Sequence, residues 1–248
     1  MKRPHIALSP GVPALQYAGD FLLDRGWHLV PTPDVPDCCF LLPVPTPPGI
    51  LSQCTPDRLP PGVTLIGGGL PDLTDTPYRA VDLLKYAPYV AQNAALTAKC
   101  ALRLAEASLP RLWQDCPVLV LGFGRIGKFL TRELLAQGAR VLVAARKEAD
   151  RALVSALGAA SQEPEKITGY LPHMRVIFNT IPAPVLSAAQ TALCRPDCIA
   201  LDLASVPGME GASVRSARGL PGKMMPESAG ALIGRAIIAH PALREAMS

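Results

Sequence analysis

Residues 118–127 read VLVLGFGRIG, an apolar run followed at once by three glycines in the pattern GxGxxG. A turn of this kind, placed between a strand and a helix, is typical of a dinucleotide-binding βαβ unit. Gly122 permits a tight turn, Gly124 lets the backbone approach a pyrophosphate, and Gly127 lets the helix pack closely. The free N–H groups and the dipole of the helix N-terminus favour the anion. We therefore predict a dinucleotide site here; the alternative is a glycine turn with no ligand.

The end of the next predicted strand indicates which dinucleotide binds. This strand runs into Ala144-Ala145-Arg146-Lys147. NAD sites usually carry an acidic residue about 20 residues after the glycine turn, where it binds the ribose hydroxyls. Arg146 lies near that position, and a guanidinium can hold a 2′-phosphate bidentately. The pattern predicts NADP(H). The alternative is that Arg146 and Lys147 are solvated charges at the start of a helix.

Polar residues follow the next two predicted strands. The strand at 176–178 is followed by Asn179-Thr180-Ile181-Pro182, and the strand at 199–201 by Asp202. Ligands of open α/β sheets lie beyond the carboxyl ends of the strands, so we expect these segments on the nicotinamide side. The alternatives are that Asn179 and Thr180 cap a helix and that Asp202 accepts local backbone N–H groups. The predicted cofactor-binding residues are Gly122, Phe123, Gly124, Arg125, Ile126, Gly127, Arg146, Lys147, Asn179, Thr180, Ile181 and Pro182.

The pattern of apolar runs predicts an α/β protein with two lobes. Residues 1–90 form a small, proline-rich α/β lobe on the substrate side, and 91–112 a long linking helix. Residues 113–225 form a doubly wound Rossmann-type domain that binds NADP, and 226–248 a C-terminal helix that packs back toward the small lobe. The elements expected are strands at 6–8, 27–30, 38–42, 63–66, 118–121, 140–144, 176–178 and 199–201, and helices at 13–25, 126–137, 148–157 and 183–193.

Composition excludes several classes of protein. The chain has 248 residues and a formal net charge of +4, without the basic stripe of a nucleic-acid binder. Seven cysteines form no CxxC pair and mostly lie in apolar runs, which indicates buried, reduced thiols. Four scattered histidines give no metal-ligand spacing, so no metal is expected. No apolar run approaches the roughly 18 residues of a membrane span. We expect a cytoplasmic protein that binds neither nucleic acid nor membrane.

Five segments resemble the A-type subunit of dipicolinate synthase, a protein of spore-forming bacteria. They read VLVLGFGRIG, VLVAARK, IFNTIP, LDLASVPG and GLPGKMMPESAG, in that order, and with their spacing the resemblance covers residues 90–240. The NTxP and PGK-like segments also resemble segments of shikimate dehydrogenases and methylene-tetrahydrofolate dehydrogenases. The resemblance implies an NADP-dependent oxidoreductase of the late lysine pathway and sporulation. It would oxidise 4-hydroxy-tetrahydrodipicolinate, or its dihydro successor, to dipicolinate, beside a flavoprotein-like B-type subunit.

The small lobe departs from the pattern of that family. Ser9-Pro10-Gly11-Val12 stands where family members carry a glycine-aspartate-arginine segment, and residues 93–100 read NAALTAKC where the family reads like NSIPTAEG. Asn93, Thr97 and Ala98 match, whereas Lys99 and Cys100 replace an acid and a glycine. The predicted substrate-binding residues are Asn93, Thr97, Ser205 and Lys223.

No residue is assigned to catalysis, and the candidates for proton transfer are Lys99 and Lys223. Two further functions stay open beside the leading one. The chain would be a non-catalytic NADP-binding partner or sensor subunit, or a shikimate-dehydrogenase-like enzyme acting on another carboxylated ring. Whether the chain forms a homo-oligomer is left open as well.

Overall fold

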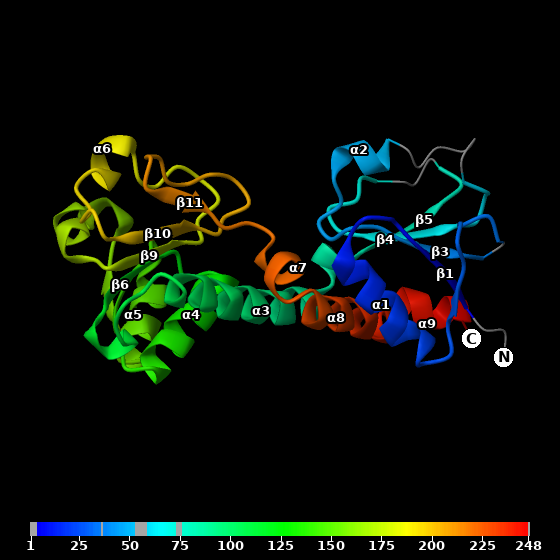
Figure 1. The fold of residues 1–248 in the computed structure, drawn as a ribbon, viewed down its shortest axis with the longest axis horizontal. Coiled ribbons are helices and arrows are strands. Elements are labelled where there is room, and N and C mark those ends of the chain that lie inside the picture. The colour runs from blue at the N-terminus through cyan, green and yellow to red at the C-terminus, as the bar shows by residue number, and fades with distance from the viewer. Residues whose placement is uncertain (1–3, 36, 53–58, 73–75, 248) are drawn as a thin grey trace. The chain divides into compact units, whose positions relative to one another are not determined.

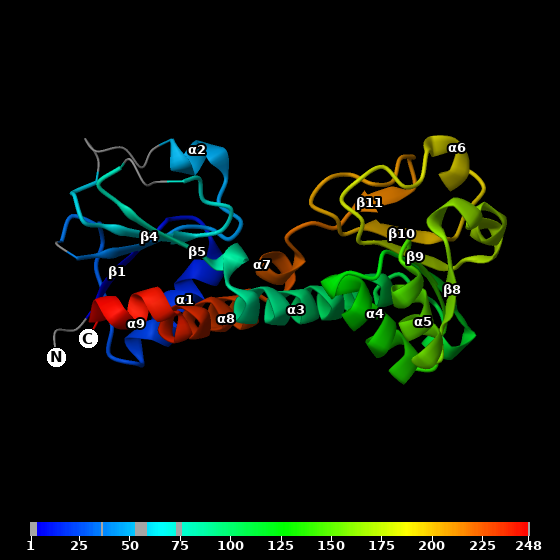
Figure 2. The ribbon, with the colours of Figure 1, turned by 180° about the vertical axis from the view of Figure 1, so that it is seen from behind.

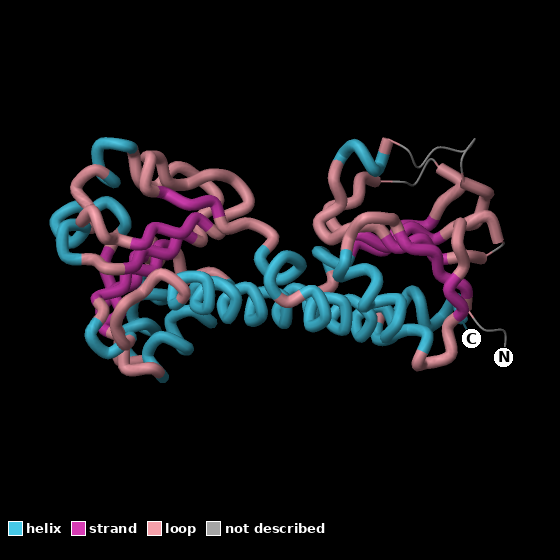
Figure 3. The backbone as a smooth tube through the Cα atoms, in the orientation of Figure 1, coloured by secondary structure: helices cyan, strands magenta, loops and turns pink. Residues whose placement is uncertain are grey.

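The computed structural model describes residues 4–35, 37–52, 59–72 and 76–247. The chain forms two compact units, of which unit 1 comprises residues 1–93 and 221–248 and unit 2 comprises residues 94–220. Each unit is built on its own parallel sheet with helices packed against it (Figure 1; Figure 3). Both units have an α/β architecture, as the sequence predicts.

Unit 2 contains a six-stranded sheet in the order β11-β10-β9-β6-β7-β8, and every pair of neighbouring strands is parallel. Taken from β8, this is the 3-2-1-4-5-6 order of a Rossmann sheet, with the strand that precedes the glycine turn at its centre. The side chains of Val118, Leu119, Val120 and Leu121 in β6 are fully buried, as expected of a strand covered on both faces. The strands are β6 (Pro117–Leu121), β7 (Arg140–Ala144), β8 (Ala160–Gln162), β9 (Val176–Asn179), β10 (Ile199–Asp202) and β11 (Val214–Ser216).

Two amphipathic helices cover the β6–β8 part of this sheet. Helix α4 (Arg125–Ala136) contacts β6 and β7, and α5 (Glu148–Ala156) contacts β7 and β8 (Figure 2). Two residues after the end of each helix stands a glycine with positive φ, Gly138 and Gly158, which is the conformation that closes helices. The shorter elements of unit 2 are η2 (Trp113–Asp115), η3 (Pro164–Lys166), η4 (Thr168–His173) and α6 (Ala188–Thr191).

Unit 1 has a five-stranded parallel sheet in the order β2-β1-β3-β4-β5. This 2-1-3-4-5 order is the flavodoxin-like variant of a doubly wound sheet. The elements are β1 (His5–Leu8), α1 (Pro13–Leu23), β2 (His28–Leu29), β3 (Cys39–Leu41), α2 (Pro48–Leu51), β4 (Thr64–Gly67), β5 (Arg79–Asp82), η1 (Leu83–Lys85), α7 (Leu220–Met224), α8 (Pro226–Ala239) and α9 (Pro241–Met247).

The C-terminal helix α8 packs side by side with α1 inside unit 1 (Figure 1). Two glycines allow the close approach. A Cβ atom at Gly230 would lie 2.6 Å from Cβ of Tyr17, and one at Gly234 would overlap the ring of Phe21. The predicted C-terminal helix at 226–248 is interrupted, because α8 ends at Ala239 and Pro241 begins α9.

The long helix α3 runs from Ala87 to Glu106, where the sequence predicts a linking segment at 91–112. The boundary between the two units falls within it, after Asn93. Residues 107–112 are not helical: residues 107 and 108 form a turn after α3 ends, and Pro110 disfavours a helical conformation of the residue before it.

The predicted helix at 183–193 is wrong over its first half. Pro184 has no N–H group to donate, and the backbone N–H groups of Val185 and Leu186 donate to the carbonyl of Gly208 instead. Leu186 also pairs with Met209 in an isolated parallel bridge. Helix α6 begins only after Ser187, whose side chain and that of Gln190 form a capping box.

Four of the cysteines, Cys38, Cys39, Cys100 and Cys116, are buried free thiols, and Cys194 and Cys198 are half-buried. Burial raises the pKa of both Cys39 and Cys198 to about 12, which leaves these thiols protonated near neutral pH. The seventh cysteine, Cys54, lies outside the described residues. Within the described residues, no helix is long and apolar enough to cross a membrane, and no cluster of His, Cys, Asp and Glu could hold a metal ion.

Candidate functional site

The glycine turn of unit 2 joins β6 to α4. Gly122 has φ +95°, a conformation that favours glycine, and a Cβ atom there would lie 2.6 Å from Oγ1 of Thr180. A Cβ atom at Gly127 would overlap the carbonyl oxygen of Gly122, so the third glycine lets the first turn of α4 close over the loop. Both glycines are therefore required by the protein itself, with or without a ligand.

Gly124 differs from the other two glycines of the turn. A Cβ atom at Gly124 would have no atom of the described residues within 4 Å, and the φ of −73° at this position suits any residue. It is the N-cap of α4, and no side chain caps the helix there. The open space and the free N–H groups of the first helical turn form a cradle for an anion. At Gly124, therefore, packing against the described part of the protein does not require the absence of a side chain.

A cavity of about 530 Å³ lies in front of this turn, at the carboxyl ends of β6, β7 and β9. It brings together the three segments that the sequence predicts for the cofactor. Its lining residues are Gly122, Phe123, Gly124, Arg125, Lys128, Ala144, Ala145, Arg146, Lys147, Asp150, Thr180, Ile181 and Pro182.

The charges around the cavity favour a ligand with several negative groups. Four cationic side chains line it, those of Arg125, Lys128, Arg146 and Lys147, against the single carboxylate of Asp150. Arg146 is exposed, and no ion pair joins its guanidinium to a carboxylate among the residues that the structure describes. A solvated, unpaired guanidinium is available to a phosphate without first breaking a salt bridge.

Sequence reasoning missed Lys128 and Asp150. Lys128 lies in the first turn of α4, three residues after Arg125, and this spacing places the two cations on one face of the helix. Asp150 is the third residue of α5, which starts directly after Lys147. The helical spacing from Arg125 is the available signal for Lys128. Asp150 could not be predicted as a cavity residue, because its place depends on which face of α5 is turned toward the cavity.

Asn179 holds the loop after β9 rather than lining the cavity. Its side chain is fully buried, and its Oδ1 accepts a hydrogen bond from the backbone N–H of Ile181 at 2.9 Å. Its Nδ2 donates to Oδ1 of Asp202 at 2.9 Å and to the carbonyl of Ile181 at 3.1 Å. Thr180, by contrast, lines the cavity, and its hydroxyl donates to the carbonyl of Leu121 at 2.9 Å. Neither residue caps a helix, because none begins at residue 183.

Asp202 connects β9 to the loop after β10 through four hydrogen bonds. Its carboxylate is 3% exposed and accepts from Asn179 and from the backbone N–H groups of Ala204, Gly208 and Met209 at 2.8–3.2 Å. The sequence left open whether Asp202 faces the ligand or accepts local backbone bonds, and the structure shows the second role. Asp202 and Asn179 together fix the segment that carries Thr180, Ile181 and Pro182.

The chain is similar to one characterised protein in sequence and to several solved structures in fold. No family model matches the chain. Over 128 residues it is 31% identical to the A-type subunit of dipicolinate synthase of Bacillus subtilis, and the match covers 48% of this chain but only 43% of that protein. The crystal structure of the corresponding subunit from Bacillus halodurans has a TM-score of 0.82, with 23% identity over 96% of this chain and 98% of that one.

Over about half of its length the chain is similar in sequence to the A-type subunit of dipicolinate synthase. This confirms the resemblance predicted from the sequence. The solved dipicolinate synthase A chain from Bacillus subtilis covers all of this chain, at 21% identity and a TM-score of 0.79, so the fold is shared by the divergent small lobe too. An L-alanine dehydrogenase shares the fold at 10% identity over 98% of this chain, with a TM-score of 0.71.

The substrate-side residues predicted from the resemblance to dipicolinate synthase are more scattered than the cofactor residues. Asn93 and Thr97 lie one turn apart on α3 and share a helix face. Lys99 is exposed and, two positions after Thr97, leaves the helix on another face. Ser205 is exposed in the loop after β10 of unit 2, and Lys223 is exposed in α7, in the part of the chain that belongs to unit 1. None of these five residues lines the cavity in front of the glycine turn.

Proposed function

We propose that the chain is an NADP-dependent oxidoreductase subunit of the dipicolinate synthase A type. The observation that carries this proposal is the position of Arg146, which lines the same cavity as the glycine turn and stands at the end of β7. An acidic residue at this strand end would bind the ribose hydroxyls of NAD and repel a 2′-phosphate, whereas a guanidinium attracts it. The excess of cations around the cavity supports the same assignment.

Different groups of cavity residues would hold the different parts of NADP. Gly124 and the first turn of α4 would hold the pyrophosphate, because the first N–H groups of a helix have no partner within the helix and no Cβ fills the space before them. Arg146 and Lys147 would hold the 2′-phosphate. Thr180, Ile181 and Pro182 would shape the nicotinamide end. When bound, NADP+ supplies an acceptor for hydride.

For the substrate we propose a cyclic dicarboxylate, 4-hydroxy-tetrahydrodipicolinate or the dihydrodipicolinate that forms from it by loss of water. The dihydro ring would lose one hydride to NADP+ and one proton to give dipicolinate. The name of the Bacillus subtilis relative and the dehydrogenase among the proteins of the same fold support this proposal. Asn93, Thr97, Ser205 and Lys223 are proposed to contact the substrate, and a flavoprotein-like B-type subunit is the proposed protein partner. Hydride transfer requires that a ring C–H be held against the cofactor, so positioning would supply much of the rate.

The choice of cofactor is tested by an Arg146→Asp substitution. We expect the affinity for NADP+ to fall by about a hundredfold, because a bidentate cation is replaced by a repelling anion, while the affinity for NAD+ changes less than about threefold. Isothermal titration calorimetry with both nucleotides measures the two effects. Arg132→Asp is the matched control, because Arg132 lies on α4 outside the cavity lining. An equal loss for both nucleotides would contradict the role given to Arg146.

A further inference from the structure

The turn that carries Arg146 is held from behind by a second arginine. Arg151, on the first turns of α5, donates through Nη1 to the backbone carbonyl of Ala145 at 2.9 Å and to that of Arg146 at 2.6 Å. The Ala145 N–H donates in turn to the carbonyl of Gln162 in β8 at 2.9 Å. The backbone between β7 and α5 is thus fixed on both sides of the peptide that places Arg146.

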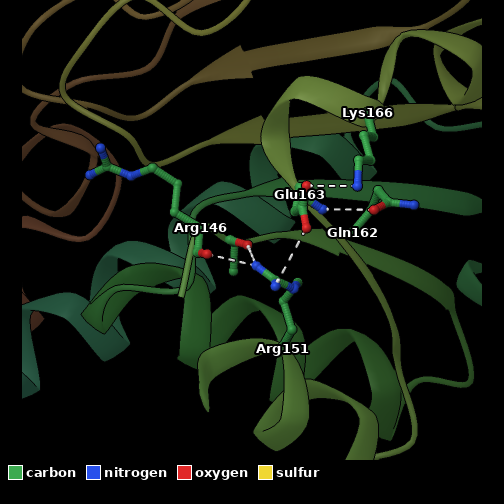
Figure 4. Close-up of polar contacts among 6 residues, drawn as sticks. Arg146, Arg151, Gln162, Glu163 and Lys166 are labelled. Atoms are coloured by element: carbon green, nitrogen blue, oxygen red, sulfur yellow. Dashed lines mark hydrogen bonds and ion pairs between the residues drawn. The ribbon is translucent and has the colours of Figure 1, made fainter. Parts of the chain in front are cut away.

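The two arginines have opposite orientations. Figure 4 shows the side chain of Arg146 extending away from Arg151, whose guanidinium lies under the Ala145–Arg146 backbone. Arg146 lines the cavity and Arg151 does not. Because the carbonyl of Arg146 is held on the Arg151 side, the direction in which the Arg146 side chain leaves the backbone is restrained.

The guanidinium of Arg151 is paired with a carboxylate, which it shares with Lys166. Its Nη2 lies 3.6 Å from Oε1 of Glu163, whose Oε2 lies 2.9 Å from Nζ of Lys166 (Figure 4). The hydrogen bond from Lys166 lowers the pKa of Glu163, which keeps this carboxylate ionised. Arg151 has 22% of its side chain exposed, and so it is more enclosed than Glu163 at 38%. Arg151 is therefore engaged by protein groups, whereas Arg146 is not paired with any carboxylate in the described part of the chain.

We infer that Arg151 is a positioning residue that sets the preference for NADP over NAD by holding the Ala145–Arg146 backbone so that Arg146 faces the 2′-phosphate. This inference rests on the proposed function, because it concerns the same cofactor site. The planar guanidinium directs Nη1 at both carbonyls while its Nη2 faces Glu163, an arrangement that an ammonium on a flexible stem does not hold as rigidly. Arg151 would fix the backbone conformation, and Arg146 would contact the 2′-phosphate.

Titration of three variants with NADP+ and NAD+ tests this role. Arg151→Met removes both carbonyl bonds and the charge, and Arg151→Lys keeps the charge but replaces the rigid, planar guanidinium by a single ammonium group on a flexible stem. We expect the ratio of NADP+ to NAD+ affinity to fall about tenfold in Arg151→Met and about fivefold in Arg151→Lys, with NAD+ affinity within about twofold of wild type. Lys166→Met is the matched control, since it removes a nearby cation that bonds neither carbonyl, and it should keep the wild-type ratio.

Each contrary result has a definite meaning. A wild-type ratio in a folded Arg151→Lys protein would show that the charge alone matters and would overturn the inference, as would equal losses for both nucleotides. If Arg151→Met does not fold, Arg151→Lys decides the question alone. Failure of the proposed function itself looks different, because the wild-type chain would then show no preference for NADP+ to lose.

Discussion

A Gly124→Val variant is expected to fold like the wild-type chain and to lose at least about a hundredfold in affinity for both NADP+ and NAD+. The introduced isopropyl group would project into the open space before the first turn of α4, where the proposed pyrophosphate sits. Because φ at this position is −73°, a valine is compatible with the backbone. Calorimetric titration measures the loss of binding, and thermal unfolding measures the retained stability.

Two other glycines provide the controls for this experiment. Gly169 also has open space at its Cβ position but lies outside the cavity lining, so Gly169→Val should affect neither folding nor nucleotide binding strongly. Gly127→Ala should instead destabilise the protein before any ligand is added, because its Cβ would overlap the Gly122 carbonyl. Nucleotide binding within about threefold of wild type in Gly124→Val would show that the cradle is not where the cofactor binds.

Asp202→Ala is expected to lower the free energy of unfolding of unit 2 by about 3 kcal/mol or more. The substitution leaves three buried backbone N–H groups without their acceptor and removes one of the two acceptors of the Asn179 amide, and each unsatisfied buried donor costs about 1–3 kcal/mol. Urea unfolding measured by Trp113 fluorescence reports on this region, since the Trp113 ring centroid lies 6.5 Å from that of Phe178 in β9. A Trp27→Phe background removes the signal of the other tryptophan.

An exposed carboxylate of the same unit serves as the comparison for Asp202. Asp197 pairs with Arg175 and Arg195 at the surface, and its replacement by alanine should cost no more than about 1 kcal/mol. Asp202→Asn should be nearly as damaging as Asp202→Ala, because one end of the amide carries donors where the carboxylate accepts. A loss for Asp202→Ala as small as that for Asp197→Ala would mean that the loops after β9 and β10 do not depend on this carboxylate.

The cofactor half of the fold follows from local sequence signals. An apolar strand, the GxGxxG turn and an amphipathic helix predict β6 and α4, and the strand ends at Arg146 and at Thr180 fall on one cavity as expected. These signals suffice because parallel strands of a doubly wound sheet meet their ligand at the same edge. The family resemblance is carried by the same segments, and the comparisons confirm it.

The short edge strands could not be predicted from the sequence. β8 and β11 have three residues each, and their side chains are mostly exposed or half-buried, so neither gives an apolar run or a clear alternation. The start of helix α6 could not be predicted either. The sequence around Pro184 shows helical spacing, but the backbone of residues 185 and 186 pairs with the loop after β10. Such pairings depend on distant residues, which a local pattern does not contain.

The individual roles of the polar residues could be assigned only from the structure. Asn179 and Asp202 stand at strand ends where ligand contacts are common, yet their side chains bind each other and the surrounding backbone. Arg151 looks like one more surface cation on a helix, and its two bonds to carbonyl groups are visible only in three dimensions. A sequence shows which groups are present near a site, whereas their partners depend on how the loops fold.

The most direct test of the central claim is a calorimetric titration of the wild-type chain with NADP+ and with NAD+, each repeated in the presence of dipicolinate. We predict that NADP+ binds at least about tenfold more tightly than NAD+, because only NADP+ engages Arg146. We also predict that dipicolinate strengthens the binding of NADP+. Equal or tighter binding of NAD+ would contradict the assignment of the cofactor, and no binding of either nucleotide would contradict the dinucleotide site itself.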